Sequence, residues 1–230
     1  MLAESPLQNG SFRHRFGRAM RKEPSAGTAA PTGPIEPVGA PMSFARNAEI
    51  YGENDPADRL YTVISGTIRT CKVLIDGRRQ IGAFYLPGET FGLETGDVHA
   101  FSAQAVTDAE VLVVKRSDLI LRAEWDNEVT RRLWILLGRE LQRAQGHALL
   151  LGKTARERVA SFLLEMAGRI RSSDEVELPM SRQDIADYLG LTIETVSRML
   201  TQFENRSTIA LPSSKRIALR NRAALKRLNA

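Results

Sequence analysis

The chain has 230 residues, of which 43% are hydrophobic and 26% are charged, a composition typical of a soluble globular protein with one or two domains. The formal net charge is +5. A single cysteine excludes an intrachain disulfide, a cysteine-based zinc site and a four-cysteine iron–sulfur cluster, and no apolar run approaches the ~20 residues that span a bilayer. We therefore expect a cytoplasmic protein with no membrane partner.

Residues 1–42 are rich in Pro, Gly, Ala and Ser and show no sustained hydrophobic period. Such a composition predicts a disordered N-terminal arm. Within it, the stretch "FRHRFGRAMRK" is basic and contains two phenylalanines. It suits either a solvated extension or a contact with nucleic acid or an acidic protein surface.

Residues 43–122 contain short β-type runs separated by glycines. The runs Tyr61 to Ile64, Thr67 to Leu74 and Val111 to Val114 are apolar and β-branched, and Asp76-Gly77 is a hairpin signal. Because free strand edges promote aggregation, several such strands predict a closed barrel or a double antiparallel sheet.

Residues 123–151 predict one long helix, because apolar residues recur there every three or four positions. The apolar stripe is wide enough to pack on the chain's own barrel and on a second copy of the chain, so we expect a homodimer. A helix that packs only within a monomer is the alternative. The predicted dimerisation residues are Val129, Leu133, Leu137, Leu141 and Ala144.

Residues 152–230 predict a helix over 154–170, followed by two short helices in "PMSRQDIADYLGLTIETVSRMLTQFENR". Ser181, with Asp184 three residues later, resembles a weak capping box, Gly190 permits a tight turn, and Thr192 caps the second helix. This pattern predicts a helix-turn-helix. The stretch "TIALPSSKRIALRN" predicts two brief strands of a wing. From residue 206 onward there are basic residues and no acids, which favours a polyanion partner.

The second short helix has one apolar and one polar face. Its polar face carries Glu194, Ser197 and Arg198. In the DNA major groove, Glu194 could accept a hydrogen bond from cytosine N4, Arg198 could donate to guanine O6 and N7, and Ser197 could bond either a donor or an acceptor on a base edge. A solvent-exposed ion pair between Glu194 and Arg198 is the plainer alternative, and the two are compatible. Contacts with DNA phosphates are predicted for Thr192, Thr195, Lys215 and Arg216.

Residues 44–225 resemble the CRP/FNR superfamily of transcription regulators, and most of all its FixK-type activators. The most specific motif is "ETVSR", which is similar to the E-x-x-S-R recognition signature of the FNR group. The resemblance implies an α+β fold with an N-terminal antiparallel β-roll of the cyclic-nucleotide-binding type, a long dimerisation helix and a C-terminal winged helix-turn-helix. It also implies a homodimer that reads a TTGAT/ATCAA-like palindrome in double-stranded DNA and contacts RNA polymerase. Its targets would be genes of microoxic or anaerobic respiration and nitrogen fixation.

The stretch "FGLETGDVHAFSAQAV" departs from the phosphate-binding motif of cyclic-AMP binders, F-G-E-L followed by R-S-A. Glu94 is displaced and Phe101 stands in place of the arginine that clamps the phosphate, so no cyclic nucleotide is expected. We expect Cys71 and His147 to be packing or surface residues and His99 to lie in a loop, so no haem is expected.

The sequence shows no catalytic or metal-binding constellation. We therefore expect no enzyme activity, no metal and no cofactor. Two alternatives to the DNA-binding activator remain open. One is an effector-dependent regulator that binds an unidentified small molecule in the β-roll, and the other is a protein-interaction module.

Overall fold

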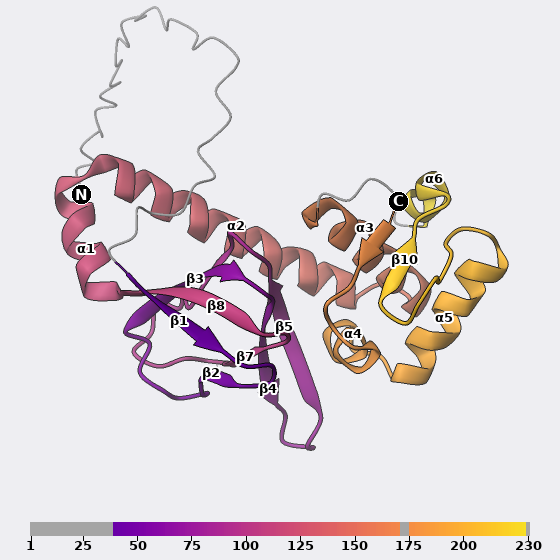
Figure 1. Ribbon diagram of the computed structural model, residues 1–230, viewed down its shortest axis with the longest axis horizontal. Helices are drawn as coiled ribbons and strands as arrows, with labels where there is room; N and C mark the ends of the chain where they lie inside the picture. The colour runs from indigo at the N-terminus through magenta and orange to yellow at the C-terminus, as the bar shows by residue number, and fades with distance from the viewer. Residues whose placement is uncertain (1–38, 171–174, 229–230) are drawn as a thin grey trace, which may run out of the picture. The chain divides into compact units, whose positions relative to one another are not determined.

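The computed structural model describes residues 39–170 and 175–228, and the first of these ranges begins with a β-roll (Figure 1). The roll consists of two four-stranded antiparallel sheets with the orders β1-β8-β3-β6 and β2-β7-β4-β5. This confirms the predicted antiparallel double sheet. The strands are β1 (Ala40–Phe44), β2 (Glu49–Tyr51), β3 (Arg59–Ser65), β4 (Ile68–Val73), β5 (Arg79–Tyr85), β6 (Thr90–Phe91), β7 (Ser102–Ala105) and β8 (Ala109–Lys115).

The interior of the roll is filled by side chains that alternate inward along the strands. Ile68 and Phe91 are fully buried there, and the rings of Tyr61 and Phe91 stack with centroids 5.1 Å apart. The predicted hairpin joins β4 to β5, with Gly77 at φ +82, a conformation that glycine adopts without strain. This hairpin brings the two strands that face the C-terminal domain into register.

The N-terminal edge of the roll differs from the prediction. Strand β1 pairs with β8 along its whole length, from Ala40 opposite Val113 to Phe44 opposite Ala109. Residues 39–42 therefore belong to the roll and not to the predicted arm. The composition of this stretch conceals the strand, because Gly39 and Pro41 are of types depleted in strands and proline is tolerated on an edge strand such as β1. The rest of the predicted arm, residues 1–38, lies outside the described residues.

Two helices follow the roll where one was predicted. They are α1 (Arg116–Trp125) and α2 (Asn127–Leu151). Between them Asp126 has an extended backbone, and its carboxylate accepts hydrogen bonds from the N–H groups of Glu128 at 2.9 Å and Val129 at 3.4 Å. This N-cap starts α2. Residues 116–122, predicted as the end of the β-roll, are therefore helical.

The C-terminal part is a winged helix-turn-helix. Its elements are α3 (Ala155–Arg169), β9 (Glu175–Glu177), α4 (Arg182–Leu189), α5 (Ile193–Asn205), β10 (Arg216–Ala218) and α6 (Arg222–Arg227). Helix α3 begins at a reciprocal capping box between Thr154 and Glu157, which explains why the predicted start at residue 154 was correct. The core of this part includes the fully buried side chains of Phe162, Phe203 and Ile217.

The wing pairs differently from the predicted hairpin. Strand β10 pairs with β9, where Ile217 lies opposite Val176. Within the described residues, β10 meets the segment just before it only through the isolated bridge between Ala210 and Ala218. Strand β9 lies in the polar stretch "RSSDEVELP", which has no strand period. Its one valine is buried, and that burial is set by the wing and not by the local sequence.

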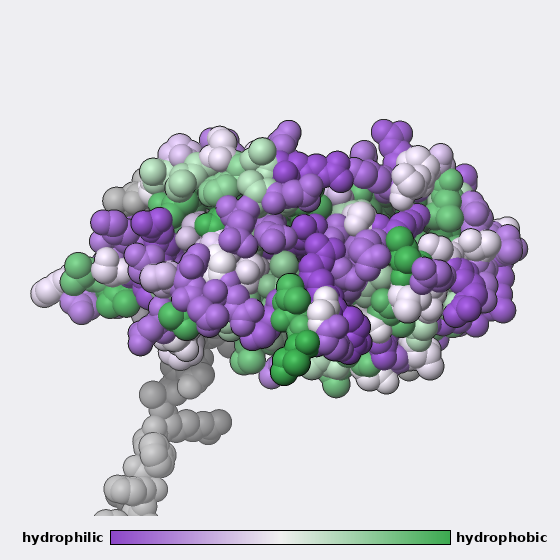
Figure 2. Space-filling model, turned by 90° about the horizontal axis from the view of Figure 1, so that it is seen from below, coloured by the Kyte–Doolittle hydropathy of each residue, from purple (hydrophilic) through white to green (hydrophobic). Residues whose placement is uncertain are grey.

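The face of the molecule in Figure 2 is largely hydrophilic and carries several separate groups of hydrophobic residues. Across residues 39–170 and 175–228, no helix combines the length and the apolar character that crossing a membrane requires. Large hydrophobic side chains nevertheless remain exposed on α2, namely Trp134, Leu137, Leu141 and Leu149. One face of this helix is therefore left uncovered by its own chain.

Candidate nucleic-acid interface

Helix α5 separates an apolar from a polar face as its sequence period predicts. Val196, Leu200 and Phe203 are buried against the rest of the helix-turn-helix. The residues predicted to read bases, Glu194, Ser197 and Arg198, are all exposed on the opposite side. The structure thus brings these three side chains together on one accessible helical surface.

The charges on this surface are available to a partner. A hydrogen bond from its own backbone N–H and one from the Thr192 hydroxyl hold the pKa of Glu194 below its usual range, so the carboxylate is an acceptor at neutral pH. Among the described residues no ion pair joins Glu194 to Arg198. The exposed surface therefore offers an acceptor and a guanidinium that do not neutralise each other by direct contact.

The turn before α5 fixes the direction of that helix. Gly190 ends α4 in the left-handed region at φ +61, and the N–H of Leu191 donates to the carbonyl of Ala186 at 3.0 Å. A Cβ at position 190 would also lie 3.4 Å from both Nη1 of Arg158 and a methyl group of Leu151. These are ordinary van der Waals distances, so the left-handed backbone angle is what favours glycine here.

Both short helices have the N-caps that the sequence predicts. The cap of α4 is a complete capping box, where only a weak one was predicted. The Ser181 hydroxyl accepts from the N–H of Asp184 at 3.1 Å, and the Asp184 carboxylate accepts from the N–H of Ser181 at 3.1 Å, which is a complete capping box. The Thr192 hydroxyl accepts from the N–H of Thr195 at 3.2 Å and caps α5. The N-terminus of each of the two helices is therefore held by a side-chain cap.

The residues predicted to contact phosphates lie in two places. Thr192 and Thr195 are at the N-terminus of α5, where backbone N–H groups and the helix dipole favour an anion. Lys215 and Arg216 are exposed at the start of β10, and their N–H groups donate to the hydroxyl of Ser213. Arg216 also lies 3.7 Å from the carboxylate of Glu177 on β9. Lys215 is accordingly the freer of the two wing cations for a phosphate.

The predicted dimerisation residues do not share one environment. Val129 is buried within the chain at 5% exposure and Leu133 is half-buried, so we remove Val129 from the predicted contact. Leu137, Leu141 and Ala144 are exposed, and the exposed stripe continues to Trp134. These four positions alternate in steps of three and four residues, which is the spacing of a helix-pairing seam.

A groove of about 440 Å³ lies between the β-roll and α2, and part of its lining comes from the stretch that departs from the phosphate-binding motif of cyclic-AMP binders. Phe101 and Glu94 line it together with Glu140 and Arg143. The guanidinium of Arg143 is 2.8 Å from the carboxylate of Glu140 and lies over the ring of Tyr85. The cation of this groove is therefore already held by a carboxylate and an aromatic face.

The three residues weighed as haem ligands have packing roles. His99 lies in a loop as predicted but is fully buried, with its ring stacked 3.5 Å from that of Tyr51. Cys71 is buried, and that burial raises the pKa of its thiol. His147 stacks on Tyr188 at 4.2 Å. Throughout the ranges that the structure describes, no group of three or more His, Cys, Asp or Glu side chains could hold a metal ion.

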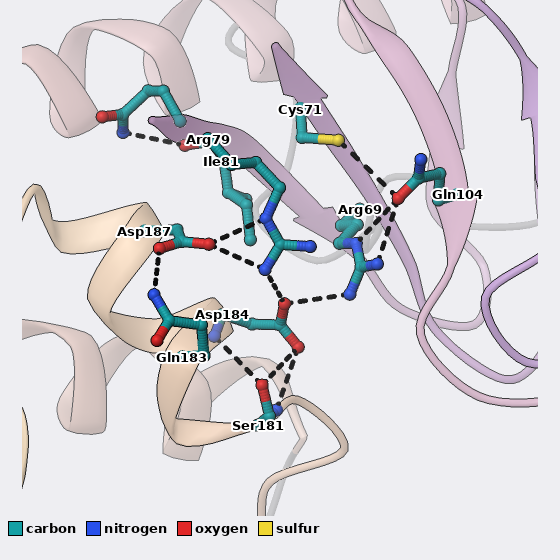
Figure 3. Close-up of polar contacts among 10 residues, drawn as sticks. Arg69, Cys71, Arg79, Ile81, Gln104, Ser181, Gln183, Asp184 and Asp187 are labelled. Atoms are coloured by element: carbon teal, nitrogen blue, oxygen red, sulfur yellow. Dashed lines mark hydrogen bonds and ion pairs between the residues drawn. The ribbon is translucent and has the colours of Figure 1, made fainter. Parts of the chain in front are cut away.

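Sequence reasoning missed a group of charged residues that joins the roll to α4. Arg69 on β4 and Arg79 on β5 both reach Asp184, and Arg79 also reaches Asp187 (Figure 3). The capping pattern identified Asp184 but not its arginine partners, which precede it by 115 and 105 residues. No local period or motif could have paired residues so far apart in the chain.

Comparison with known proteins gives matches along nearly the whole chain. Residues 157–228 match a Crp-like helix-turn-helix domain and residues 41–121 match a cyclic nucleotide-binding domain. The chain is 52% identical to the nitrogen fixation regulation protein FixK of Azorhizobium caulinodans, over 98% of this chain and 95% of that protein. It is 42% identical to FixK of Rhizobium meliloti, over 84% and 93% of the two chains.

Solved structures show the same likeness. The structure of FixK2 from Bradyrhizobium japonicum superimposes with a TM-score of 0.81 and 50% sequence identity, covering 84% of this chain and 98% of that one. A CRP-family transcriptional regulator from Thermus thermophilus gives a TM-score of 0.68 at 31% identity, over 82% and 96% of the two chains.

Proposed function

The chain belongs to the CRP/FNR family of DNA-binding transcription regulators, and on that premise we propose that it is a homodimeric activator reading a TTGAT/ATCAA-like palindrome. The observation that carries the proposal is the exposed triplet Glu194, Ser197 and Arg198 on the second helix of the helix-turn-helix. The relatives named as nitrogen fixation regulation proteins support target genes of microoxic or anaerobic respiration and nitrogen fixation. RNA polymerase is the partner that activation requires.

Each half-site is read by one α5 helix lying in the major groove. Arg198 donates two hydrogen bonds to guanine O6 and N7, Glu194 accepts from cytosine N4, and Ser197 bonds either kind of base edge. The lowered pKa of Glu194 supports its role, since a protonated carboxyl would lose acceptor capacity. Thr192 and Thr195 bind phosphates at the helix N-terminus and hold the helix in register.

Pairing of two α2 helices places the two reading helices on successive turns of one DNA face, about 34 Å apart. The exposed apolar stripe from Trp134 through Leu137 and Leu141 to Ala144 supports this pairing, because a single chain leaves it in water. A two-fold protein axis then requires a two-fold operator. The symmetry of the palindrome follows from the symmetry of the helix pair.

The dimer binds DNA without a small-molecule effector. Phe101 occupies the position where a cyclic phosphate would need an arginine, and Arg143 is engaged with Glu140. A phosphate entering the groove would meet the carboxylates of Glu94 and Glu140 and would have to displace one of them from a cation. Control of activity is thus exerted on synthesis, degradation or chemical modification of the protein.

We expect purified protein to bind a palindromic duplex with a Kd of about 10⁻⁸ to 10⁻¹¹ M near physiological salt, with no nucleotide added. The logarithm of the affinity should fall linearly with the logarithm of salt concentration, because phosphate contacts release counterions. Fluorescence anisotropy with a labelled duplex measures both, and a duplex with scrambled half-sites is the control. A strict need for cyclic AMP would support the effector-dependent regulator, and indifference to DNA would support the protein-interaction module.

Replacing Lys215 by alanine should weaken binding to matched and scrambled duplexes by similar factors. Its ammonium is exposed at the start of β10 and neutralises a phosphate, which carries no sequence information. The slope of log affinity against log salt should become shallower by about 1 per protomer. Lys72→Ala is the matched control, since Lys72 lies on the β-roll and pairs with Glu53 at 2.8 Å. A loss confined to the matched duplex would show that Lys215 reads bases instead.

A further inference from the structure

Strands β4 and β5 of the roll meet helix α4 through a group of four charged residues, Arg69, Arg79, Asp184 and Asp187, here called the ion cluster (Figure 3). Oδ1 of Asp184 lies 2.9 Å from Nη1 of Arg69 and 2.6 Å from Nη2 of Arg79. Oδ2 of Asp187 lies 2.7 Å from both Nε and Nη2 of Arg79. The guanidinium of Arg79 thus bridges two carboxylates one helical turn apart on α4.

The two carboxylate oxygens of Asp184 have different partners, one in the N-cap of α4 and the other on the strands of the roll. Its Oδ2 accepts from the N–H of Ser181 at 3.1 Å and from the Ser181 hydroxyl at 2.8 Å, which caps α4. Its Oδ1 accepts from the two arginines of the roll. The first turn of α4 is therefore attached directly to the strands, and α4 cannot turn about its axis without breaking charged hydrogen bonds.

The surroundings hold each member of the cluster in place. Oε1 of Gln104 on β7 accepts from Nη2 of Arg69 at 3.0 Å, and Nε2 of Gln183 donates to Oδ1 of Asp187 at 2.6 Å. The side chains of Arg69 and Asp184 are 9% and 6% exposed. Burial strengthens the attraction between the charges and also raises the cost of leaving either one unpaired.

At the other end of α4, the carbonyl oxygen of Tyr188 lies 2.7 Å from Nε2 of His147 on α2 and accepts from the uncharged Nε2 of Gln80 on β5 at 3.4 Å, a longer bond than those of the ion cluster. Apolar contacts supplement these bonds. Tyr188 packs against Phe84 of β5, with ring centroids 5.3 Å apart, and belongs to one core cluster with Ile81 and Phe162. Such packing provides free energy that depends little on the angle of approach. A buried ion pair adds little net stability but imposes geometry, since charged hydrogen bonds weaken steeply with misalignment.

We infer that the ion cluster sets the angle of the helix-turn-helix on the β-roll and thereby the half-site spacing that the dimer accepts. Helix α2 packs against the roll and also bears the exposed apolar stripe. The Gly190 turn fixes the direction of α5 relative to α4. The position of α5 relative to the two-fold axis then depends on how α4 sits on the strands. Arg69, Arg79, Asp184 and Asp187 are thus positioning residues for DNA reading, and this inference rests on the proposed function.

Operator spacing reports this geometry directly. Inserting or removing one base pair between half-sites moves one of them by about 3.4 Å and rotates it by about 34°. A dimer with rigidly held reading helices rejects the shifted operator, whereas a dimer with looser helices tolerates it. A variant that is merely less stable loses affinity for all spacings by the same factor, so the ratio of affinities separates positioning from folding.

The experiment measures Kd for full-length protein by anisotropy on a series of palindromes that differ only in half-site spacing. Arg79→Gln and Asp187→Asn are the test variants, chosen because Arg79 and Asp187 are less buried than Arg69 and Asp184. We expect each to reduce the discrimination between best and shifted spacing by about 3- to 10-fold, and the double variant to add little beyond either. Arg78→Gln is the matched control, since Arg78 pairs with Asp76 in the exposed turn. It should keep the wild-type ratio.

The outcomes separate this inference from the proposed function. Wild-type protein that binds none of the palindromes would overturn the proposed function and the positioning role with it. A wild-type spacing preference that persists undiminished in both test variants overturns the positioning role alone. The same holds if affinity falls equally at every spacing, because the cluster would then only stabilise the fold. A flattened spacing profile in both test variants, with Arg78→Gln unchanged, establishes the role.

Discussion

Leu137→Glu is expected to yield monomers and to lower the affinity for a palindromic duplex by about 10²- to 10⁴-fold. A monomer binds one half-site only, so the gain in affinity from binding two linked half-sites at once is lost. Leu137 lies at the middle of the exposed apolar stripe on α2, between Trp134 and Leu141. In a helix pair its side chain would be enclosed by the partner, and a carboxylate there would be buried without a cation. Sedimentation equilibrium measures the mass, and anisotropy measures the affinity.

Gln142→Glu is the matched control for this substitution. It introduces the same charge on the same helix at an exposed position that falls outside the three-and-four spacing of the stripe. We expect it to remain dimeric and to bind DNA as the wild type does. Leu141→Glu should behave like Leu137→Glu. Dimers of unchanged mass in both leucine variants would rule out α2 as the pairing helix.

Arg198→Ala is expected to reduce specific binding by about 1 to 3 kcal/mol per half-site, which is roughly 5- to 150-fold for each. A palindrome contains two such contacts, so the free-energy losses at the two half-sites add in the dimer. Arg198 is exposed on α5, and its removal should leave the melting temperature unchanged. Affinity should be measured on four duplexes that differ only in the base at the proposed guanine position. The preference of Arg198→Ala for guanine there should be weaker than that of the wild type.

Arg220→Ala removes the same charge from an exposed position between β10 and α6 and is the matched control for Arg198→Ala. It should lower affinity for all duplexes slightly and leave the order of base preferences intact. If Arg198→Ala instead lost affinity equally on matched and mismatched duplexes, Arg198 would be a phosphate contact. The base reading would then have to come from Glu194 and Ser197 alone.

Local signals in the sequence determined much of the helix-turn-helix. The period of α5 separates Val196 and Phe203 from Glu194 and Arg198, and the caps at Ser181 and Thr192 mark where the two helices begin. These features act over three or four residues, since a helix brings only such neighbours together. For the same reason the hairpin at Asp76-Gly77 was readable from the sequence, as a tight turn is a local structure, closed here by the N–H of Leu74 donating to the carbonyl of Arg78.

The tertiary structure decided the pairings between distant segments. It paired β9 with β10, enclosed Val129 within the chain, and brought Arg69 and Arg79 to Asp184 across more than a hundred residues. Such contacts depend on how the whole chain closes, because a charged residue in a strand carries no local sign of which helix will cover it. The sequence by itself determined which residues of α5 lie on its exposed face, whereas the fold decided what holds that face at its angle. The physical reason is that helical period is a property of neighbouring residues and orientation is a property of packed domains.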